Sequence, residues 1–278
     1  MLACNKEGMK RQSLKTIIKT CKGKTFNYKP LLSMAKDTKT KKGLSYGYLT
    51  GILYLSPSSE GRQEGLNIPN TCPFATIGCK KACLYTAGRG AFFSIKKARL
   101  HKTLFLLEGK TFNALPHQEG LLSLKYDIES LKTKAHNKGL IPCIRLNGTS
   151  DLKCHTWGLM EDFNNIQFYD YTKDFSRMKL YMQGLLPSNY HLTFSYNEDN
   201  KKACQEVLKQ GHNVAVCFKG ALPNFFMGYK VINGDLHDMT FIHKAKKGLI
   251  IGLIAKGKAK KDIEGFTIDN RQGLKSIL

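Results

Sequence analysis

The amino-acid sequence predicts an α/β protein, a partial (β/α) barrel with mostly parallel strands. Strand-like and helix-like segments alternate along residues 140–257, which is the pattern of βαβ units and a parallel sheet. The nearly continuous apolar run GLIIGLIAKG at 248–257 suits a strand that is buried on both faces. The hydrophobic content of 42% is enough for a full core. The six or seven predicted strands fit either a partial barrel or an open doubly wound sheet.

A change in composition near residue 44 predicts two parts. Residues 1–43 contain twelve Lys or Arg against two acidic residues, with little apolar periodicity, so we expect a basic N-terminal extension. Residues 44–278 are expected to form the α/β domain, which carries the cysteine cluster described below. One α/β domain of this length is common.

Helices are predicted where apolar residues recur at helical spacing. In one such segment Leu121, Leu124 and Ile128 share a helix face, and Gly139 ends the helix as a C-cap. Strands are predicted from β-branched and aromatic runs that are bounded by turn residues. The predicted helices are 91–108, 118–137, 157–164, 174–183 and 199–210. The predicted strands are 46–57, 140–148, 165–172, 190–197, 213–218, 229–235 and 248–257.

The formal net charge of +23 predicts a polyanionic partner, namely nucleic acid or a nucleotide. The alternative is that the lysines are only solvated surface residues. The chain opens without a secretory signal, and no apolar run reaches the ~18 residues of a membrane span. We therefore expect a cytoplasmic protein without membrane contact. Disulfides are not expected there, so clustered cysteines favour metal or redox roles.

Polar residues follow the carboxyl ends of the predicted strands, where the loops of a parallel α/β fold converge. Arg145 lies inside an apolar strand and Asp170 lies near the end of an aromatic one, so we expect these two residues to pair on neighbouring strands. The alternative for several positions is ordinary turn chemistry. The candidate substrate-binding residues are Arg145, Asp170, Lys173, Ser195, Asn197, Lys219, Asp235 and Lys256.

Three cysteines follow the first strand, Cys72, Cys79 and Cys83, with the spacing C-x6-C-x3-C. Thiolates are soft ligands that suit zinc or an iron–sulfur cluster. A structural zinc site normally has four protein ligands, so zinc would need a distant fourth residue. Three thiolates on a four-iron cluster leave one iron open for chemistry. We predict a [4Fe-4S] cluster here, with zinc or metal-free buried cysteines as the alternatives.

Three clustered cysteines after the first strand of a partial parallel barrel resemble the radical SAM superfamily. This resemblance implies that S-adenosylmethionine chelates the open iron, with Asn147, Ser150 and Asp151 as candidate cofactor-binding residues. The chain departs from the usual C-x3-C-x2-C spacing, and no Gly-Gly-Glu stretch follows its second strand. Over residues 45–266 the sequence looks more closely like a family of phage and plasmid proteins, which implies no activity. The blocks that carry this likeness are TCPFATIGCKKAC, RLNGTSDL, QFYDYTK, YHLTFSYNE and GLIAKGKA.

From these observations we expect an iron–sulfur protein that resembles radical SAM enzymes and acts on nucleic acid or a nucleotide. Its location would be the host-cell cytoplasm if the chain is encoded by a phage or plasmid. The alternative is a non-catalytic nucleic-acid-binding protein that serves replication and has a structural zinc site. The placement of charge separates the two functions. If the basic residues of 1–43 and 244–261 form one stripe away from the cysteines, binding is the main role.

Overall fold

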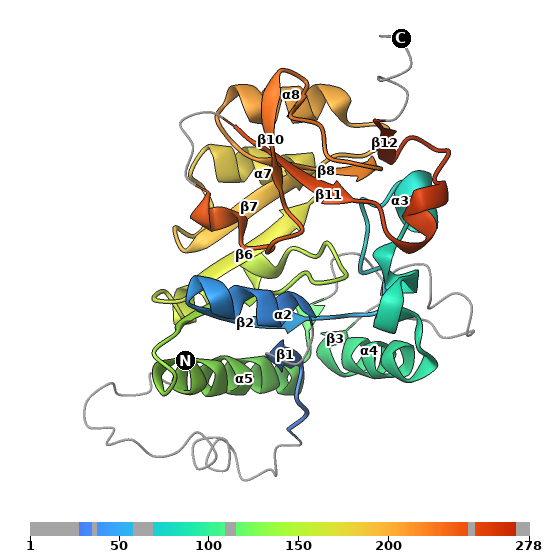
Figure 1. Cartoon of the computed structure of the whole chain (residues 1–278). Helices are drawn as coiled ribbons and strands as arrows, with labels where there is room; N and C mark the ends of the chain where they lie inside the picture. The colour runs from blue at the N-terminus through green and yellow to red at the C-terminus, as the bar shows by residue number, and fades with distance from the viewer. Residues whose placement is uncertain (1–27, 35–37, 58–68, 109–114, 244–247, 271–278) are drawn as a thin grey trace, which may run out of the picture.

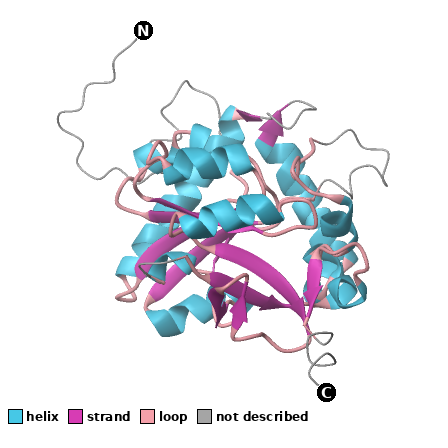
Figure 2. Ribbon diagram, turned by 90° about the horizontal axis from the view of Figure 1, so that it is seen from above, coloured by secondary structure: helices cyan, strands magenta, loops and turns pink. Residues whose placement is uncertain are grey.

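The computed structural model describes residues 28–34, 38–57, 69–108, 115–243 and 248–270 (Figure 1). In this part of the chain, 10 strands form one open, mostly parallel sheet with helices on both sides of it (Figure 2). The predicted α/β class with a mostly parallel sheet is confirmed, and the described strands do not close into a barrel. Most of the predicted N-terminal extension, residues 1–27 and 35–37, lies outside the described residues.

Every predicted strand is present in the sheet. The strands in spatial order are β1 (Leu32–Met34), β2 (Tyr48–Leu53), β5 (Ile141–Arg145), β6 (Gln167–Thr172), β7 (Tyr190–Ser195), β8 (Val214–Lys219), β11 (Ile250–Ile254), β10 (Tyr229–Asn233) and β9 (Phe225–Phe226), and β12 (Thr267–Asp269) also pairs with β8. Only β1 and β9 pair antiparallel with their neighbours in this sheet. A separate short hairpin joins β3 (Leu107–Glu108) and β4 (Leu115–Pro116).

Each predicted helix is also present, although some are shorter than predicted. The helices are α2 (Thr38–Lys42), α3 (Ile77–Lys81), α4 (Phe93–Leu106), α5 (Gln118–His136), α6 (Leu159–Asp162), α7 (Phe175–Met182) and α8 (Lys201–Lys209). The 3-10 turns are η1 (Gly43–Tyr46), η2 (Leu84–Thr86), η3 (Gly88–Ala91), η4 (Cys154–Thr156), η5 (Thr240–Ile242) and η6 (Gly257–Lys261). Among the described residues, no helix combines the length and the apolar composition that a membrane crossing requires.

The two faces of the sheet are covered by different structural elements. One face packs on α5, α7 and α8 in the main hydrophobic core, to which Ile144, Phe168 and Leu192 contribute, and we call it the helix face. The other face carries Cys143 and Tyr169 and packs on η5 and its flanking residues, and we call it the loop face. Successive strand residues alternate between the faces, so each strand supplies side chains to both.

The end of the predicted N-terminal extension packs on α5. Leu31 is fully buried, and Leu32 begins strand β1 at the edge of the sheet. The buried Asp127 carboxylate of α5 accepts hydrogen bonds from the N–H groups of Leu31 and Leu32 at 2.7 and 2.8 Å. The same carboxylate accepts from the Tyr28 hydroxyl at 2.5 Å. One helix side chain therefore fixes the first described segment of the chain.

The variant Asp127→Ala is expected to lower the free energy of unfolding by about 1–3 kcal/mol, because it leaves buried N–H groups without an acceptor. Urea unfolding measures this loss. The matched control is Asp162→Ala, which removes an exposed ion pair with Lys125 and is expected to change stability by less than about 1 kcal/mol. Equal losses in the two variants would contradict the role given to Asp127.

Candidate metal centre

Residues 69–92, which we call the cysteine loop, cross the carboxyl ends of the parallel strands. The N–H of Asp151, in the loop after β5, donates to the Thr71 carbonyl at 2.7 Å. Farther along, the N–H of Gly78 donates to the carboxylate of Glu198, after β7, at 2.7 Å. The cysteine loop therefore lies at the edge of the sheet where parallel α/β folds gather their functional groups.

The short helix α3 holds the second cysteine, Cys79, and the third, Cys83, follows just after the helix as the N-cap of η2. The Thr76 side chain caps α3 by accepting from the N–H of Cys79 at 3.2 Å. Gly78 leaves room for Glu198, since a Cβ at position 78 would come within 2.7 Å of that carboxylate. Cys83 lies four residues after Cys79, beyond the end of α3 and in a non-helical conformation, so the short segment Ala82–Cys83 sets its position relative to Cys79.

Lys173, in the loop after β6, is linked electrostatically to all three cysteines. Its ammonium interacts with each thiol, and Cys79 is the cysteine that acts on it most strongly. Burial alone lowers the pKa of Lys173, but Cys79, Asp151 and Cys72 together raise it above its usual value. The lysine is therefore charged at neutral pH. A cation among thiols favours their thiolate forms, which are the forms that bind metal.

A second cation, Arg99, lies near Cys83. Burial raises the pKa of the Cys83 thiol, and the guanidinium of Arg99 opposes part of this rise. The guanidinium lies 4.8 Å from the centre of the buried Tyr85 ring. Sequence reasoning missed Arg99. The available signal is its position four residues before the buried Thr103, on the inner face of α4.

The cysteine loop supplies donor atoms whose chemistry suits a metal centre built on thiolates. The three thiols are only partly exposed and form no disulfide. Soft sulfur donors next to cationic side chains suit zinc or an iron–sulfur cluster. Among the described residues, no group of three or more His, Cys, Asp and Glu side chains is arranged to hold a metal ion. The three thiols have one interaction in common, which is the electrostatic interaction with the Lys173 ammonium.

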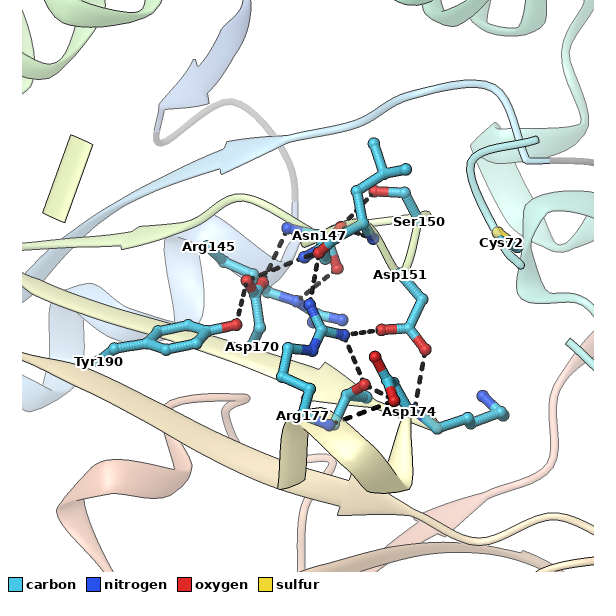
Figure 3. Close-up of polar contacts among 12 residues, drawn as sticks. Cys72, Arg145, Asn147, Ser150, Asp151, Asp170, Asp174, Arg177 and Tyr190 are labelled. Atoms are coloured by element: carbon cyan, nitrogen blue, oxygen red, sulfur yellow. Dashed lines mark hydrogen bonds and ion pairs between the residues drawn. The ribbon is translucent and has the colours of Figure 1, made fainter. Parts of the chain in front are cut away.

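A buried polar network joins the loops after β5 and β6 beneath the cysteine loop (Figure 3). Asp170 accepts from the backbone N–H of Asn147 at 2.7 Å, from its side-chain amide at 3.0 Å and from the Tyr190 hydroxyl at 3.1 Å. Asp151 forms an ion pair with Arg177, whose side chain is 1% exposed. Sequence reasoning missed Arg177, because a lone arginine in a short helix carries no sign that it is buried.

The residues predicted to bind S-adenosylmethionine are part of this network or border it. Asn147 and Asp151 use their side chains inside it, and the Ser150 hydroxyl donates to the side-chain Oδ1 of Asn147 at 2.8 Å. The same loop contacts the cysteines, since the Thr149 carbonyl lies 3.5 Å from the sulfur of Cys72. The loop after β5 therefore contacts Cys72 through the backbone carbonyl of Thr149.

Arg145 does not pair with Asp170, which corrects the ion pair expected from the sequence. The register between β5 and β6 places Arg145 beside Tyr169 on the loop face, while Asp170 points to the helix face. Arg145 instead pairs with the buried Asp238 at 2.7 Å, and its guanidinium lies 4.6 Å from the centre of the Tyr171 ring. Arg145 lies opposite Tyr169, one residue before Asp170, and this offset of one residue places Arg145 and Asp170 on opposite faces of the sheet.

The other predicted substrate-binding residues are engaged in turns and ion pairs along the same edge. The Ser195 carbonyl and the Asn197 side chain accept hydrogen bonds in the turn after β7, at 2.9 and 3.0 Å. Asp235 pairs with Lys256. Lys219 donates to a backbone carbonyl just after η6 and so joins β8 to that segment.

A hollow of about 550 Å³ lies at the opposite, amino-terminal edge of the sheet. Its lining includes Tyr181, His191, His212, Phe241 and His243, and none of the predicted site residues. The Tyr181 hydroxyl forms a hydrogen bond with Nδ1 of His191 at 3.1 Å. Burial lowers the pKa of His191 to about 4, so this ring is neutral at pH 7. This hollow and the cysteines therefore occupy opposite edges.

The fold and the site define an open, mostly parallel α/β protein with a cysteine loop at the carboxyl edge of its sheet. The Gene product 88 family matches residues 28–270, and the chain belongs to this family. This finding agrees with the resemblance to phage and plasmid proteins. No curated protein and no solved structure matches the chain. Nothing in these comparisons indicates the radical SAM superfamily.

The carboxyl group of Asp170 is expected to make stability depend on pH. Burial raises its pKa to about 6, above the ~3.9 of an unfolded chain. Between these values the folded state binds more protons, so Asp170 contributes stability at low pH that is lost as the pH rises through 6. The stability advantage of the wild type over Asp170→Asn is therefore expected to shrink by about 2–3 kcal/mol from about pH 4 to pH 7.

Urea unfolding of the two proteins across this pH range measures the difference. The exposed position Asp162 provides the control, since the gap between the wild type and Asp162→Asn is expected to stay nearly constant. A gap between wild type and Asp170→Asn that stays constant or widens with pH would refute the assignment.

Proposed function

We propose that Cys72, Cys79 and Cys83 hold an iron–sulfur cluster in an enzyme that resembles radical SAM proteins. We propose further that it acts on nucleic acid or a nucleotide in the host-cell cytoplasm. The observation that carries the proposal is that three cysteines of one loop, on the carboxyl edge of a parallel sheet, all interact electrostatically with the Lys173 cation. A thiolate-ligated cluster is anionic, so a charged lysine among its ligands supplies a counter-charge.

The order of the strands supports the likeness to a partial (β/α) barrel. Strands β2, β5, β6, β7 and β8 are neighbours in the sheet in the order in which they follow one another in the chain. The three cysteines come directly after the first of these parallel strands. This is the arrangement on which the resemblance to radical SAM enzymes rests.

Groups of this chain are available to hold S-adenosylmethionine. A [4Fe-4S] cluster held by three protein thiolates would leave one iron open and, in its reduced state, would supply the electron that cleaves S-adenosylmethionine. Glu198 accepts from the N–H of Gly78 through one carboxylate oxygen. Its second oxygen is buried and has no hydrogen-bond partner among the described residues, so it would accept from the cofactor's amino group. Asn147, Ser150 and Asp151 would hold the neighbouring loop in place.

The position of the basic residues favours an enzyme that acts at the cysteines over a protein that only binds nucleic acid on a separate surface. Lys258, Lys260 and Lys261 belong to η6, whose Ala259 is buried together with Ala82 of the cysteine loop. These lysines therefore lie beside the candidate centre. A polyanionic substrate attracted by them would be brought to the cysteines.

Metal analysis tests the proposal directly. Anaerobic reconstitution with iron and sulfide is expected to give about four irons per chain and a broad absorption band near ~400 nm. The variant Cys79→Ala is expected to lose most of this iron, because one of three protein ligands is gone. Cys204→Ala is the matched control, since Cys204 is a buried cysteine of α8 in the core, and it is expected to retain the iron.

Two results would overturn the cluster. One is recovery of a single zinc and no iron, which would favour the non-catalytic protein with a structural zinc site. The other is equal iron content in Cys79→Ala and Cys204→Ala.

A further inference from the structure

The cysteine loop and the segment around η6 expose large apolar side chains. Phe92 is 60% exposed and Phe93 73% exposed at the start of α4. Ile77 and Leu84 of the cysteine loop are exposed as well, and Ile263 is 91% exposed just after η6. Scattered apolar residues on a surface need no explanation, but a contiguous group of them marks an interaction site.

These residues belong to one surface, because η6 packs directly on the cysteine loop. Ala259 is buried against Ala82, and a Cβ on Gly257 would come within 2.9 Å of the Cβ of Ala87. In Figure 1 the red segment that follows β11 lies beside α3. We call the exposed part of residues 77–97 and 256–263 the carboxyl-edge surface.

The carboxyl-edge surface is strongly basic. Residues 77–97 contain five Lys or Arg and no acidic residue, and residues 256–263 contain four Lys and one Asp. Lys258, Lys260 and Lys261 are exposed and form no ion pair with any described residue. This charge is available to an anionic ligand.

A hollow of about 310 Å³ lies between α3 and η6. Its lining consists of Lys81, Ala82, Lys258, Lys261, Ile263 and the acidic residues Asp262 and Glu264. Lys81 also pairs with Glu264 at 2.5 Å, which fixes one wall of the hollow. Asp262 accepts hydrogen bonds from Thr267, and Glu264 is paired with Lys81, so Lys258 and Lys261 are the lining cations that form no ion pair with a described residue.

We propose that the carboxyl-edge surface binds a single-stranded nucleic acid. Phe92 and Phe93 are the stacking platforms for unpaired bases, and Lys258, Lys260 and Lys261 contact the phosphates. The inference rests on the proposed function in one respect, because it names the substrate class that is presented to the cysteines. The binding itself does not require the cluster.

The pairing of exposed aromatic rings with lysines favours a single strand over a duplex. Stacking on an aromatic side chain needs the face of a base, and a duplex buries these faces between neighbouring base pairs. The lysines attract the backbone of either form. Only a strand with unpaired bases uses both Phe92 and Phe93 and the basic residues at once.

The composition of α4 argues against a membrane as the ligand. Phe93, Lys97, His101 and Leu104 are all exposed and recur at helical spacing along one face. A helix that lies in a membrane interface has an unbroken apolar stripe. On this face of α4, Lys97 and His101 lie between Phe93 and Leu104 and so interrupt the apolar stripe.

Fluorescence anisotropy of the full chain with a labelled oligothymidylate of about 16 nucleotides tests the proposal, since such surfaces cover up to about that length. Binding is expected to be tighter than to a duplex of equal length. The double variant Phe92→Ala/Phe93→Ala is expected to weaken single-strand binding by at least about 10-fold. The matched control is Phe225→Ala, an equally exposed phenylalanine in β9 beside the first residues of β10, at the amino-terminal edge.

The lysines are tested by the dependence of affinity on salt. Replacing Lys258, Lys260 and Lys261 with Gln is expected to reduce the slope of log affinity against log salt by about 2, for three lost phosphate contacts. Lys201→Gln/Lys202→Gln on α8 is the control and is expected to leave the slope nearly unchanged.

Three results would overturn the inference: equal affinity for single strand and duplex, unchanged affinity in the double phenylalanine variant, or binding to phosphatidylserine–phosphatidylcholine vesicles without binding to the oligonucleotide. Iron is measured on the same preparations so that the two proposals fail separately. Wild type that binds the single strand but holds no iron after reconstitution overturns only the cluster. Iron-loaded wild type whose affinity is unaffected by the phenylalanine substitutions overturns only the single-strand surface.

Discussion

The geometry of the carboxyl edge depends on the contacts of Asp151. Its N–H donates to Thr71 at the start of the cysteine loop, and its carboxylate accepts from the N–H of Lys173 at 2.8 Å. The same carboxylate pairs with the buried Arg177. One residue thereby connects the cysteine loop with the loops after β5 and β6. A buried charge without its partner is strongly unfavourable, so removing Arg177 or the Asp151 carboxylate would destabilise this edge of the sheet.

Because successive residues of a strand point to opposite faces of the sheet, the buried charged side chains are divided between the helix face and the loop face. On the helix face, Asp170 takes its hydrogen bonds from Asn147 and Tyr190. On the loop face, Arg145 pairs with Asp238, and the Tyr169 hydroxyl donates to Asp238 at 3.1 Å. Each carboxylate is thus satisfied by groups on its own side of the sheet, as burial requires.

The cations of the carboxyl edge act in two environments. Lys173 lies among the cysteine thiols, where low solvent access makes its interaction with a thiolate strong. The lysines of η6 are exposed, where water and salt weaken each interaction and only their sum attracts a polyanion. The proposed cluster depends on the first environment, and the proposed binding of a single strand depends on the second.

The sequence by itself determined the α/β class, the strands and helices, and the position of the cysteine motif after the first parallel strand. These features follow from local periodicity and from turn residues, which can be read along the chain. Tertiary structure alone decided that Arg145 and Asp170 face opposite sides, because strand register depends on partners distant in sequence. The open sheet, with β11 between β8 and β10, likewise depends on contacts that no local pattern encodes. The same reason explains why the electrostatic link between Lys173 and the cysteines, and the burial of Arg177, became visible only in the folded chain.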